Sequence, residues 1–449
     1  MRAADQPRNR FLRRSLPLFL GLLLLLCCAW PLAQQIWDEA GALEVNRELN
    51  RPELIAKGRY LAVLGDCKAC HTSVDGLPYA GGRALEVPGL GTLYTSNITP
   101  DLKAGIGGWS LEEFERALRR GIGEDGRNLY PAMPYEAYAK VTDEDIRALY
   151  AYFLFGVKPV HNEPPENKIR NLLSARWPIQ IWNWLFVERD VFEPDPEQSS
   201  VWNRGAYLVQ GLTHCGECHT PRGLAFQEKA YNERGRGFLA GGPVLDGWEA
   251  YNITPDPDSG IGKWSAEQLA QYLKTGHVNR LAQAGGPMAE AIQNSFAQVH
   301  DDDIAAIVTY LRGIPAVKGK DRSPRQSRGT PASDVIPLRG NTFEEDIGGG
   351  RENAADGARL YLGLCASCHG VDGAGTSDGY YPSLFHNSTV GAHSDHNLRR
   401  TILDGVSRTV DGHEKMMPGF ARQLSEVQFE ALLRYVRRQF GSAETEPAD

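Results

Sequence analysis

Three copies of the pentapeptide Cys-x-x-Cys-His, at residues 67–71, 215–219 and 365–369, constrain this chain more than any other feature. The pattern is the attachment signature of covalently bound haem. Its two thiols lie on one helical turn and add to the two haem vinyl groups, and the histidine that follows binds the iron. A zinc site or a redox dithiol can also use Cys-x-x-Cys, but neither explains three copies that each end in histidine. The sequence therefore predicts three covalently bound haem c groups.

The three motifs account for most of the cysteines of the chain. Six of the eight cysteines lie in them, and the other two, Cys27 and Cys28, lie in an N-terminal apolar run. Apart from that pair, no thiol remains for a disulfide or a further metal site. The predicted haem-attaching residues are Cys67, Cys70, Cys215, Cys218, Cys365 and Cys368. The predicted proximal iron ligands are His71, His219 and His369.

Methionine supplies the candidates for the sixth iron ligand, because thioether ligation completes the coordination of many c-type haems. Besides Met1 the chain has four methionines, and each lies downstream of one haem motif. We predict Met133, Met288 and Met417 as the distal ligands, with Met417 preferred to Met416 because a proline follows it, as one follows Met133. Two alternatives stay open: a methionine can fill a gap in a core, and another histidine can bind iron. Those histidines, whose positions do not repeat between the motifs, are His161, His277, His300, His386, His393, His396 and His413.

Residues 1–36 read as an export signal peptide or an N-terminal membrane anchor. Five arginines and one aspartate precede an apolar run at residues 16–33, and no good cleavage site follows that run. A run of this length is longer than an ordinary signal core and just long enough to span a bilayer. Both possibilities stay open. Either one predicts a cytoplasmic N-terminus and a body on the periplasmic side of a bacterial cell membrane.

The charge of the remaining chain argues against nucleic-acid binding. Removal of residues 1–36 takes away five arginines and one aspartate, which changes the formal net charge from −8 to −12. An acidic exported body suits weak, charge-steered docking between electron-transfer proteins. Residues 442–449 form a short acidic tail.

The chain contains an internal repeat of about 150 residues. The segment GRYLAVLGDCKACHT at residues 58–72 matches GAYLVQGLTHCGECHT at 205–220, and the later segment SNITPD matches YNITPD. A third copy keeps GARLYLGLCASCHG but lacks the Asn-Ile-Thr-Pro-Asp stretch. We place the three repeats at residues 37–160, 201–315 and 350–441.

Capping signals and periodicity predict helices in each repeat, and hence an all-α fold of three tandem haem domains. Capping boxes, which satisfy the free N–H groups at a helix start, are predicted for Ser110 with Glu113, Ser265 with Gln268 and Ser425 with Gln428. A glycine lies near the start of each first helix, and a tyrosine lies near the end of each last helix. We expect these two helices to cross, with the glycine against the aromatic ring; the residues are Gly58, Gly205, Gly357, Tyr152, Tyr310 and Tyr435.

Two connectors and one repeated loop leave alternatives open. Residues 161–200 are too aromatic for a free tether, so Trp177 to Phe186 either face a partner or pack internally. Residues 316–349 read as an extended or mobile linker. In the repeated loop, a set of polar and indole side chains either contacts haem or stabilises a turn before a capped helix. That set is Asn97, Thr99, Trp109, Asn252, Thr254 and Trp264.

With these motifs the chain resembles the tri-haem cytochrome c subunits of membrane-bound dehydrogenases, such as those for alcohols, sorbitol and gluconate. The resemblance covers nearly everything after residue 40. It rests on the haem motifs together with GIGGWS and YPAMPY in the first repeat, CHTPR and GPMAEA in the second, and CASCHGVDGAG and MPGF in the third. It implies three class I cytochrome c-like domains. It also implies electron flow from a flavin- or quinone-bearing catalytic subunit to ubiquinone or a terminal oxidase at the membrane surface.

The residues themselves favour a relay over an enzyme. Haems with histidine and methionine ligands have no open position for oxygen or peroxide, and the chain has no dinucleotide fingerprint or nucleophile constellation. We therefore expect no catalytic residue and no oxidation of an organic substrate by this chain itself. The alternatives are an electron-transfer partner of a molybdenum hydroxylase, a haem peroxidase and a free-standing carrier.

Overall fold

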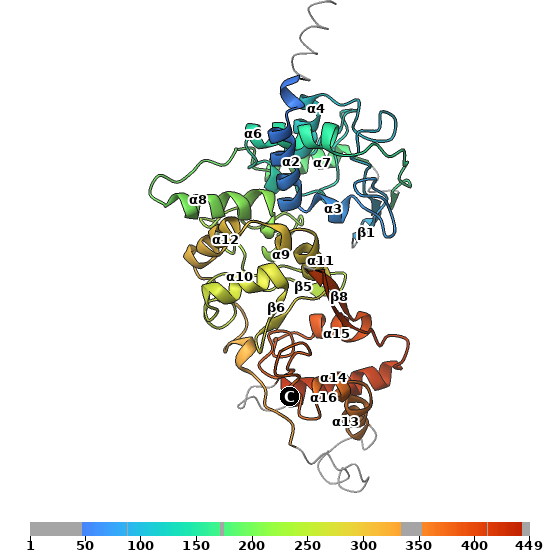
Figure 1. The fold of residues 1–449 in the computed structure, drawn as a ribbon, viewed down its shortest axis with the longest axis vertical. Helices are drawn as coiled ribbons and strands as arrows, with labels where there is room; N and C mark the ends of the chain where they lie inside the picture. The colour runs from blue at the N-terminus through green and yellow to red at the C-terminus, as the bar shows by residue number, and fades with distance from the viewer. Residues whose placement is uncertain (1–46, 88, 171–174, 334–352, 411, 442–449) are drawn as a thin grey trace, which may run out of the picture.

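The computed structural model describes residues 47–87, 89–170, 175–333, 353–410 and 412–441. The three repeats follow one another along the long axis of the molecule, with the first repeat at one end and the third at the other (Figure 1). The predicted signal or anchor and the acidic tail lie outside the described residues. Among the helices that the structure describes, none combines the length and the apolar character needed to cross a bilayer.

A pair of crossing helices forms the frame of each repeat. The pairs are α2 (Pro52–Leu64) with α6 (Asp143–Ala151), α8 (Ser200–Tyr207) with α12 (Asp301–Gly313), and α13 (Asn353–Leu364) with α16 (Glu426–Phe440). At each crossing a Cβ atom on the glycine would collide with a backbone carbonyl of the facing helix and with the Cβ of the tyrosine. This confirms the predicted approach, which brings together Gly58 and Tyr152, Gly205 and Tyr310, and Gly357 and Tyr435.

The predicted helix starts are also confirmed. Complete capping boxes begin α4 (Leu111–Arg120), α10 (Ala266–Thr275) and α16. In each box the serine hydroxyl accepts a hydrogen bond from the backbone N–H of the third helical residue, whose side chain in turn accepts from the backbone N–H of the serine. Local sequence alone therefore fixes where these helices begin.

Short helices complete the frame. They are α3 (Cys67–Cys70), α5 (Tyr135–Tyr138), α7 (Trp177–Phe186), α9 (Cys215–His219), α11 (Gly286–Asn294), α14 (Ala366–His369) and α15 (His396–Asp404). Two π-helical turns, Tyr152–Gly156 and Leu208–Leu212, extend α6 and α8, and 3-10 turns lie at Phe296–Gln298 and Arg325–Ser327.

The fold is helix-rich, but it also contains small antiparallel sheets that the all-α prediction lacked. The strands are β1 (Ala84–Val87), β2 (Gly91–Tyr94), β3 (Lys168–Ile169), β4 (Val244–Leu245), β5 (Trp248–Glu249), β6 (His277–Val278), β7 (Ala282–Gln283), β8 (Val406–Val410) and β9 (His413–Met417). They form one sheet in the order β1-β2-β3 and three two-stranded hairpins. Strands of two to five residues show no sustained alternation of apolar and polar residues, so periodicity did not reveal them.

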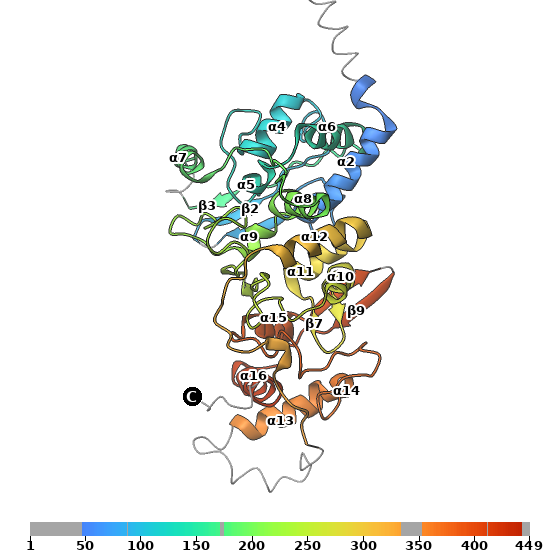
Figure 2. The ribbon, with the colours of Figure 1, turned by 90° about the vertical axis from the view of Figure 1, so that its left-hand side faces the viewer.

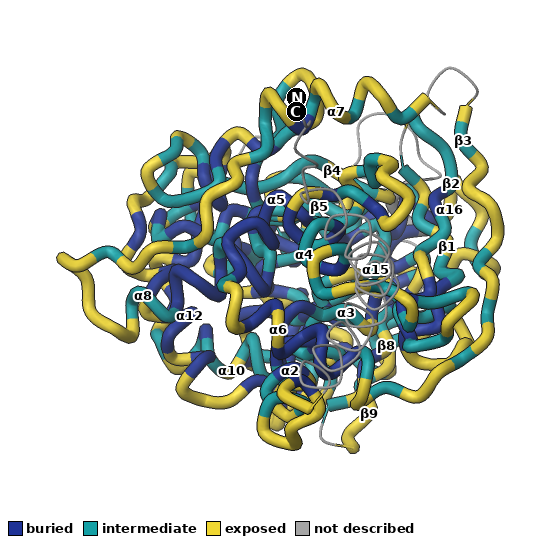
Figure 3. Tube along the Cα trace, turned by 90° about the horizontal axis from the view of Figure 1, so that it is seen from above, coloured by how far each residue is buried: buried dark blue, intermediate teal, exposed yellow. Residues whose placement is uncertain are grey.

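The described residues contain two hydrophobic cores. The first runs from Leu49 to Ile314 and is shared by the first two repeats. The second runs from Ala332 to Phe440 and belongs to the third repeat. Figure 3 shows the buried stretches gathered inside a largely exposed rim.

The contacts between the first two repeats are reciprocal. The hydroxyl of Tyr207 on α8 donates to Oδ2 of Asp145 on α6 at 2.5 Å, and the hydroxyl of Tyr60 on α2 donates to Oδ2 of Asp303 on α12 at 2.7 Å. The two tyrosines occupy matching positions of the repeat, as do the two aspartates. A cation on each first helix also pairs with the aspartate of its own repeat, Lys57 with Asp145 and Arg204 with Asp303.

The second connector packs more closely than its composition predicts. Arg325 and Arg328 of the second connector are each only 6% exposed, and Arg328 donates to the carbonyl of Gly391 at 3.0 Å. Residues 316–333 are therefore anchored on the protein at Arg325 and Arg328, and residues 334–349 lie outside the described part of the chain.

In the first connector, α7 is held on one side: the Nε1 of Trp182 donates to the Ala225 carbonyl at 2.8 Å, and the buried Asn183 accepts from the Tyr135 hydroxyl at 2.7 Å. The helix lies at the outer edge of the molecule (Figure 2).

Candidate haem sites

Each Cys-x-x-Cys-His motif lies on a short helix that follows the first helix of its repeat. The first is on α3, the second on α9 and the third at α14. The backbone N–H of each histidine or its neighbour closes the turn onto a motif residue, as in the 3.0 Å bond from His71 N to Cys67 O and the 2.9 Å bond from His369 N to Cys365 O. The predicted attachment residues and proximal ligand are thus brought together within one turn in every repeat.

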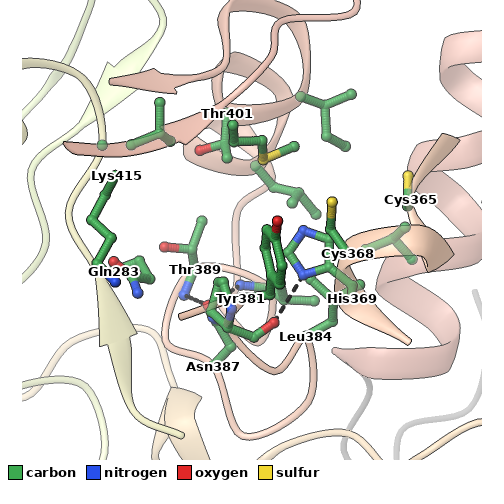
Figure 4. Close-up of a pocket in the computed structure, with 18 of the residues that line it drawn as sticks. Gln283, Cys365, Cys368, His369, Tyr381, Leu384, Asn387, Thr389, Thr401 and Lys415 are labelled. Atoms are coloured by element: carbon green, nitrogen blue, oxygen red, sulfur yellow. Dashed lines mark hydrogen bonds between the residues drawn. The ribbon is translucent and has the colours of Figure 1, made fainter. Parts of the chain in front are cut away.

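The three histidines share one orientation, which a backbone carbonyl sets. Nδ1 of His71 lies 2.7 Å from the Ser96 carbonyl, and Nδ1 of His219 lies 2.6 Å from the Tyr251 carbonyl. Nδ1 of His369 lies 2.8 Å from the carbonyl of Pro382 (Figure 4). Because a carbonyl can only accept, Nδ1 carries the proton and Nε2 keeps its lone pair for a metal.

Burial keeps these imidazoles neutral. It lowers the pKa of His71, His219 and His369 below the usual value, although the bond to the carbonyl acts in the opposite direction. A neutral imidazole is the form that coordinates a metal. Tautomer and charge state therefore both fit the predicted role as proximal iron ligands.

The third repeat contains a cavity beside its haem motif. It is bordered by the three motif residues and by Met417, and Figure 4 shows Gln283 and Lys415 on the side opposite Cys365. Apolar side chains form much of its wall: Leu384, Val390, Leu398, Ile402, Leu432 and Val436. A thioether-bound macrocycle needs such an apolar pocket with thiols and imidazole at one side, so the residues present fit a haem.

The methionines differ in their exposure. Met416 is 61% exposed, whereas Met417 is half-buried and packs against the core of the third repeat. Met417 pairs with Val406 in the β8–β9 hairpin. Met133 and Met288 are likewise half-buried, and both pack against the first core together with Cys67 and Cys215. These surroundings suit the three predicted distal ligands.

The polar side chains of the repeated loop form hydrogen bonds with other parts of the protein. The Asn97 Oδ1 accepts from the backbone N–H and the hydroxyl of Thr99 at 2.9 and 2.7 Å, and its Nδ2 donates to the Val160 carbonyl at 2.8 Å. Asn252 and Thr254 repeat this arrangement, with Val317 in place of Val160. These four side chains therefore stabilise the turn, and whether they also contact haem stays a prediction.

Trp264 fits the interpretation in which a residue of this loop contacts the haem. Its side chain is buried, and its Nε1 donor has no hydrogen-bond acceptor within the described chain. A buried donor without an acceptor is costly unless a bound group supplies one. Trp109, the matching residue of the first repeat, is only half-buried and packs against the first core.

Comparison with known proteins places these sites in a family. The family model described as cytochrome C oxidase, cbb3-type, subunit III matches residues 352–436. The fructose dehydrogenase cytochrome subunit of Gluconobacter japonicus is 44% identical over 406 residues, which cover 88% of this chain and 81% of that protein. The cytochrome c subunit of the alcohol dehydrogenase (quinone) of Gluconobacter oxydans (strain 621H) is 39% identical over 87% of this chain and 79% of that protein. The gluconate 2-dehydrogenase cytochrome c subunit of Pantoea cypripedii is 37% identical over 87% of this chain and 86% of that protein.

The chain belongs to the family of dehydrogenase cytochrome c subunits. Covalently bound haem c and a part in electron transport follow from this membership. The resemblance read from the motifs is confirmed.

Sequence reasoning missed a buried acidic cluster between the first two haem sites. Glu136 lies three residues after Met133, and Glu217 lies between the two cysteines of the second motif. Together with Glu228 they place carboxylate oxygens within 4.8 Å of one another. Nη2 of Arg222 donates to Glu217 at 2.6 Å, and the Tyr231 hydroxyl donates to Glu136 at 3.0 Å. The guanidinium thus already supplies a cation to this cluster.

Burial raises the pKa of two of these carboxyl groups, and the negative charge of Glu217 adds to the effect. The pKa of Glu136 rises to about 8, and that of Glu228 rises well above its usual value. Near neutral pH the cluster therefore holds protons as well as the Arg222 charge. No spacing pattern joins residues 136, 217 and 228, so this cluster could not be predicted from the sequence.

Proposed function

We propose that this chain binds three haem c groups and relays electrons through them. In each repeat the two motif cysteines hold the haem, the histidine binds its iron, and Met133, Met288 or Met417 completes the coordination. A haem with these ligands exchanges one electron at a time and offers no open position to oxygen or peroxide. The single observation that carries the proposal is the threefold repetition of a histidine whose Nδ1 is bonded to a backbone carbonyl.

The polypeptide contributes to this function by positioning each haem and its ligands. The helix pair of each repeat fixes the motif helix, the carbonyl orients the imidazole, and the apolar wall excludes water. We place the three haem domains at residues 37–160, 201–315 and 350–441. Because they stand in a row, electrons entering at one end pass through the middle site to reach the other end (Figure 1).

The partners follow from the family. The relatives are named as cytochrome subunits of fructose, alcohol and gluconate dehydrogenases. We propose that the donor is a flavin- or quinone-bearing catalytic subunit that oxidises a CH–OH group, and that the acceptor is ubiquinone or a terminal oxidase. The complex would work on the periplasmic side of the bacterial cell membrane.

Haem stoichiometry tests the central claim. Intact-mass measurement of the mature protein should show three covalent haem additions, and the pyridine haemochrome spectrum should give three haems per chain. A stable product with two haems and one unmodified motif would contradict the proposal.

Co-purification tests the partner. An affinity-tagged chain expressed from its native locus should retain a dehydrogenase subunit, and the substrate of that subunit should reduce all three haems. A chain that is reduced only by unspecific reductants, with no bound subunit, would instead be a free-standing carrier.

A further inference from the structure

The side chain of Arg408 crosses from the third repeat into the second. It leaves strand β8 and is only 2% exposed. Its Nε donates to the Thr275 carbonyl at 3.1 Å, and its Nη1 donates to the Ala284 carbonyl at 3.0 Å. Its Nη2 donates to Oε1 of Gln283 at 2.7 Å. Every acceptor belongs to the second repeat, and none of them carries a charge.

The charge of Arg408 is not neutralised by the protein. No carboxylate among the described residues lies within ion-pair distance of the guanidinium, whereas Arg399 and Arg400 on the neighbouring α15 each pair with acids. An arginine stays protonated even when buried, so a full positive charge sits in a weakly screening environment. Isolated buried charges are costly and are rarely retained without a role.

Arg408 lies between two candidate haem sites. It borders the cavity of the third motif, and two residues before it on β8 stands Val406, the strand partner of Met417. On the other side, its acceptor Ala284 lies just before α11, the helix that carries Met288. Figures 1 and 2 both show the β8–β9 hairpin reaching alongside α11 of the second repeat.

The first repeat fills the equivalent place without a charge. Gly276 ends α10, and a Cβ there would press on the Arg408 guanidinium; Gly121, the matching residue after α4, is covered by the ring of Tyr135 from its own repeat. A neutral ring therefore suffices to close this helix end. The cation at the second repeat is not required for packing alone.

We propose that Arg408 is a positioning residue that sets the reduction potential of the third haem and fixes the junction between the second and third sites. This rests on the proposed haem binding. One-electron reduction lowers the charge at the iron by one, so a nearby unpaired cation favours the reduced form and raises the potential. Its three hydrogen bonds tie the segment leading to Met288 to the hairpin that carries Met417.

The test is a redox titration of each haem in the full-length protein with its haems attached, the third haem being assigned by the spectral change that Met417→His produces. Arg408→Gln should lower the potential of the third haem so that its reduction equilibrium falls about tenfold, which is about 59 mV for one electron. The potential of the first haem should not move. Arg408→Lys keeps the charge and should restore most of the potential.

Gln283→Glu provides a second route that leaves Arg408 in place. It puts a carboxylate at the acceptor of Nη2, so it should lower the third potential in the same direction as Arg408→Gln, even if that variant fails to fold. Lys415→Gln is the matched control, because Lys415 borders the same cavity but is partly exposed and screened by solvent; its effect should be much smaller.

Four results would overturn the proposal. One is an unchanged third potential in fully haem-loaded Arg408→Gln or Gln283→Glu. Another is an equal shift of the first haem, which would indicate a global change. The third is an Arg408→Lys variant that matches Arg408→Gln, because that would assign the effect to hydrogen-bond geometry instead of charge. Loss of the third haem in every variant, including Gln283→Glu, would likewise show a purely structural role.

Discussion

Each candidate iron-binding histidine depends on a carbonyl that is distant in the sequence. The acceptors follow their histidines by 25, 32 and 13 residues. A backbone carbonyl has no sequence signature, so the motif predicts the ligand but not the contact that selects its tautomer. The same holds for Glu136 and Arg408, whose partners come from other repeats.

Removal of the Met417 side chain should free the sixth coordination position of the third haem iron. Met417→Ala leaves the iron without its thioether, so the reduced protein should bind one carbon monoxide per chain and the potential of that haem should fall. Met416→Ala is the matched control, because that side chain is 61% exposed, and it should do neither. Difference spectra with carbon monoxide measure both. If only the Met416→Ala variant binds carbon monoxide, the distal ligand is Met416 instead of Met417. If the unchanged protein binds carbon monoxide, a peroxidase is favoured.

The raised pKa of Glu136 predicts that alkaline pH weakens the contact between the first two repeats. With a folded pKa of about 8 against an ordinary value of 4.5, the folded state binds more protons than the unfolded state between these pH values. Stability is therefore full at low pH and falls as the pH rises through this window. Thermal unfolding should show a melting temperature several degrees lower at pH 8.5 than at pH 6.

Glu136→Gln should reduce that dependence, since the amide cannot ionise; Glu228, whose pKa burial also raises, accounts for the slope that remains. The exposed Glu163→Gln is the control and should keep the full pH slope. A slope that is identical in all three proteins would remove Glu136 as its source.

At the scale of elements, features that depend on a short stretch of sequence could be predicted, whereas features that depend on contacts between distant segments could not. The capping serines and the glycines of the helix crossings follow from short stretches of sequence, and the structure confirms them. The placement of the β8–β9 hairpin and the packing of the connectors depend on contacts between segments far apart in the chain. The β8–β9 hairpin, for example, forms on the surface of the second repeat, where the Thr409 N–H donates to Gln293 at 2.7 Å.

The helix crossing in the third repeat should not tolerate a methyl group. Gly357→Ala drives a Cβ into the Ala431 carbonyl and should cost more than ~3 kcal/mol or prevent haem attachment. Gly363→Ala on the same helix meets no atom within 4 Å and should be neutral or stabilising by ~0.5–1 kcal/mol. Haem content and thermal unfolding are measured for both variants. Equal behaviour of the two would contradict the close approach of the helices at Gly357.

The outer face of α7 is the expected membrane contact. Trp177 and Trp184 are 66% and 75% exposed, and no charged residue interrupts the helix. Exposed tryptophans favour the interface of a bilayer. Trp177→Ser with Trp184→Ser should weaken co-sedimentation with anionic liposomes and leave the three haem spectra unchanged.

Trp182 is left in place in this test because its Nε1 bonds to the Ala225 carbonyl. The control replaces Val74 and Leu102, exposed apolar residues outside α7, with serine. If the α7 variant loses the catalytic subunit but keeps its liposome binding, the face belongs to a protein interface.

At the scale of the whole molecule, the three repeats are joined in two different ways. The first two share a hydrophobic core, whereas the third has its own core and attaches through polar contacts together with Val410 of β8, which packs against the first core. Among the polar contacts, Asn397 exchanges two hydrogen bonds with the backbone of Glu249, at 2.7 and 2.9 Å, and Arg408 supplies three more. Denaturant should therefore release the third repeat before it separates the first two.

Two matching hydrogen bonds, from Tyr60 to Asp303 and from Tyr207 to Asp145, join the first two repeats. This is the pattern of a two-fold symmetric dimer, in which each subunit contributes the same surface patch to the interface. Here one polypeptide supplies both patches. A dimer of separate subunits comes apart on dilution, but an intramolecular pair stays together at any concentration. The gap that an electron must cross between the first two sites is therefore the same however few copies of the protein a cell contains.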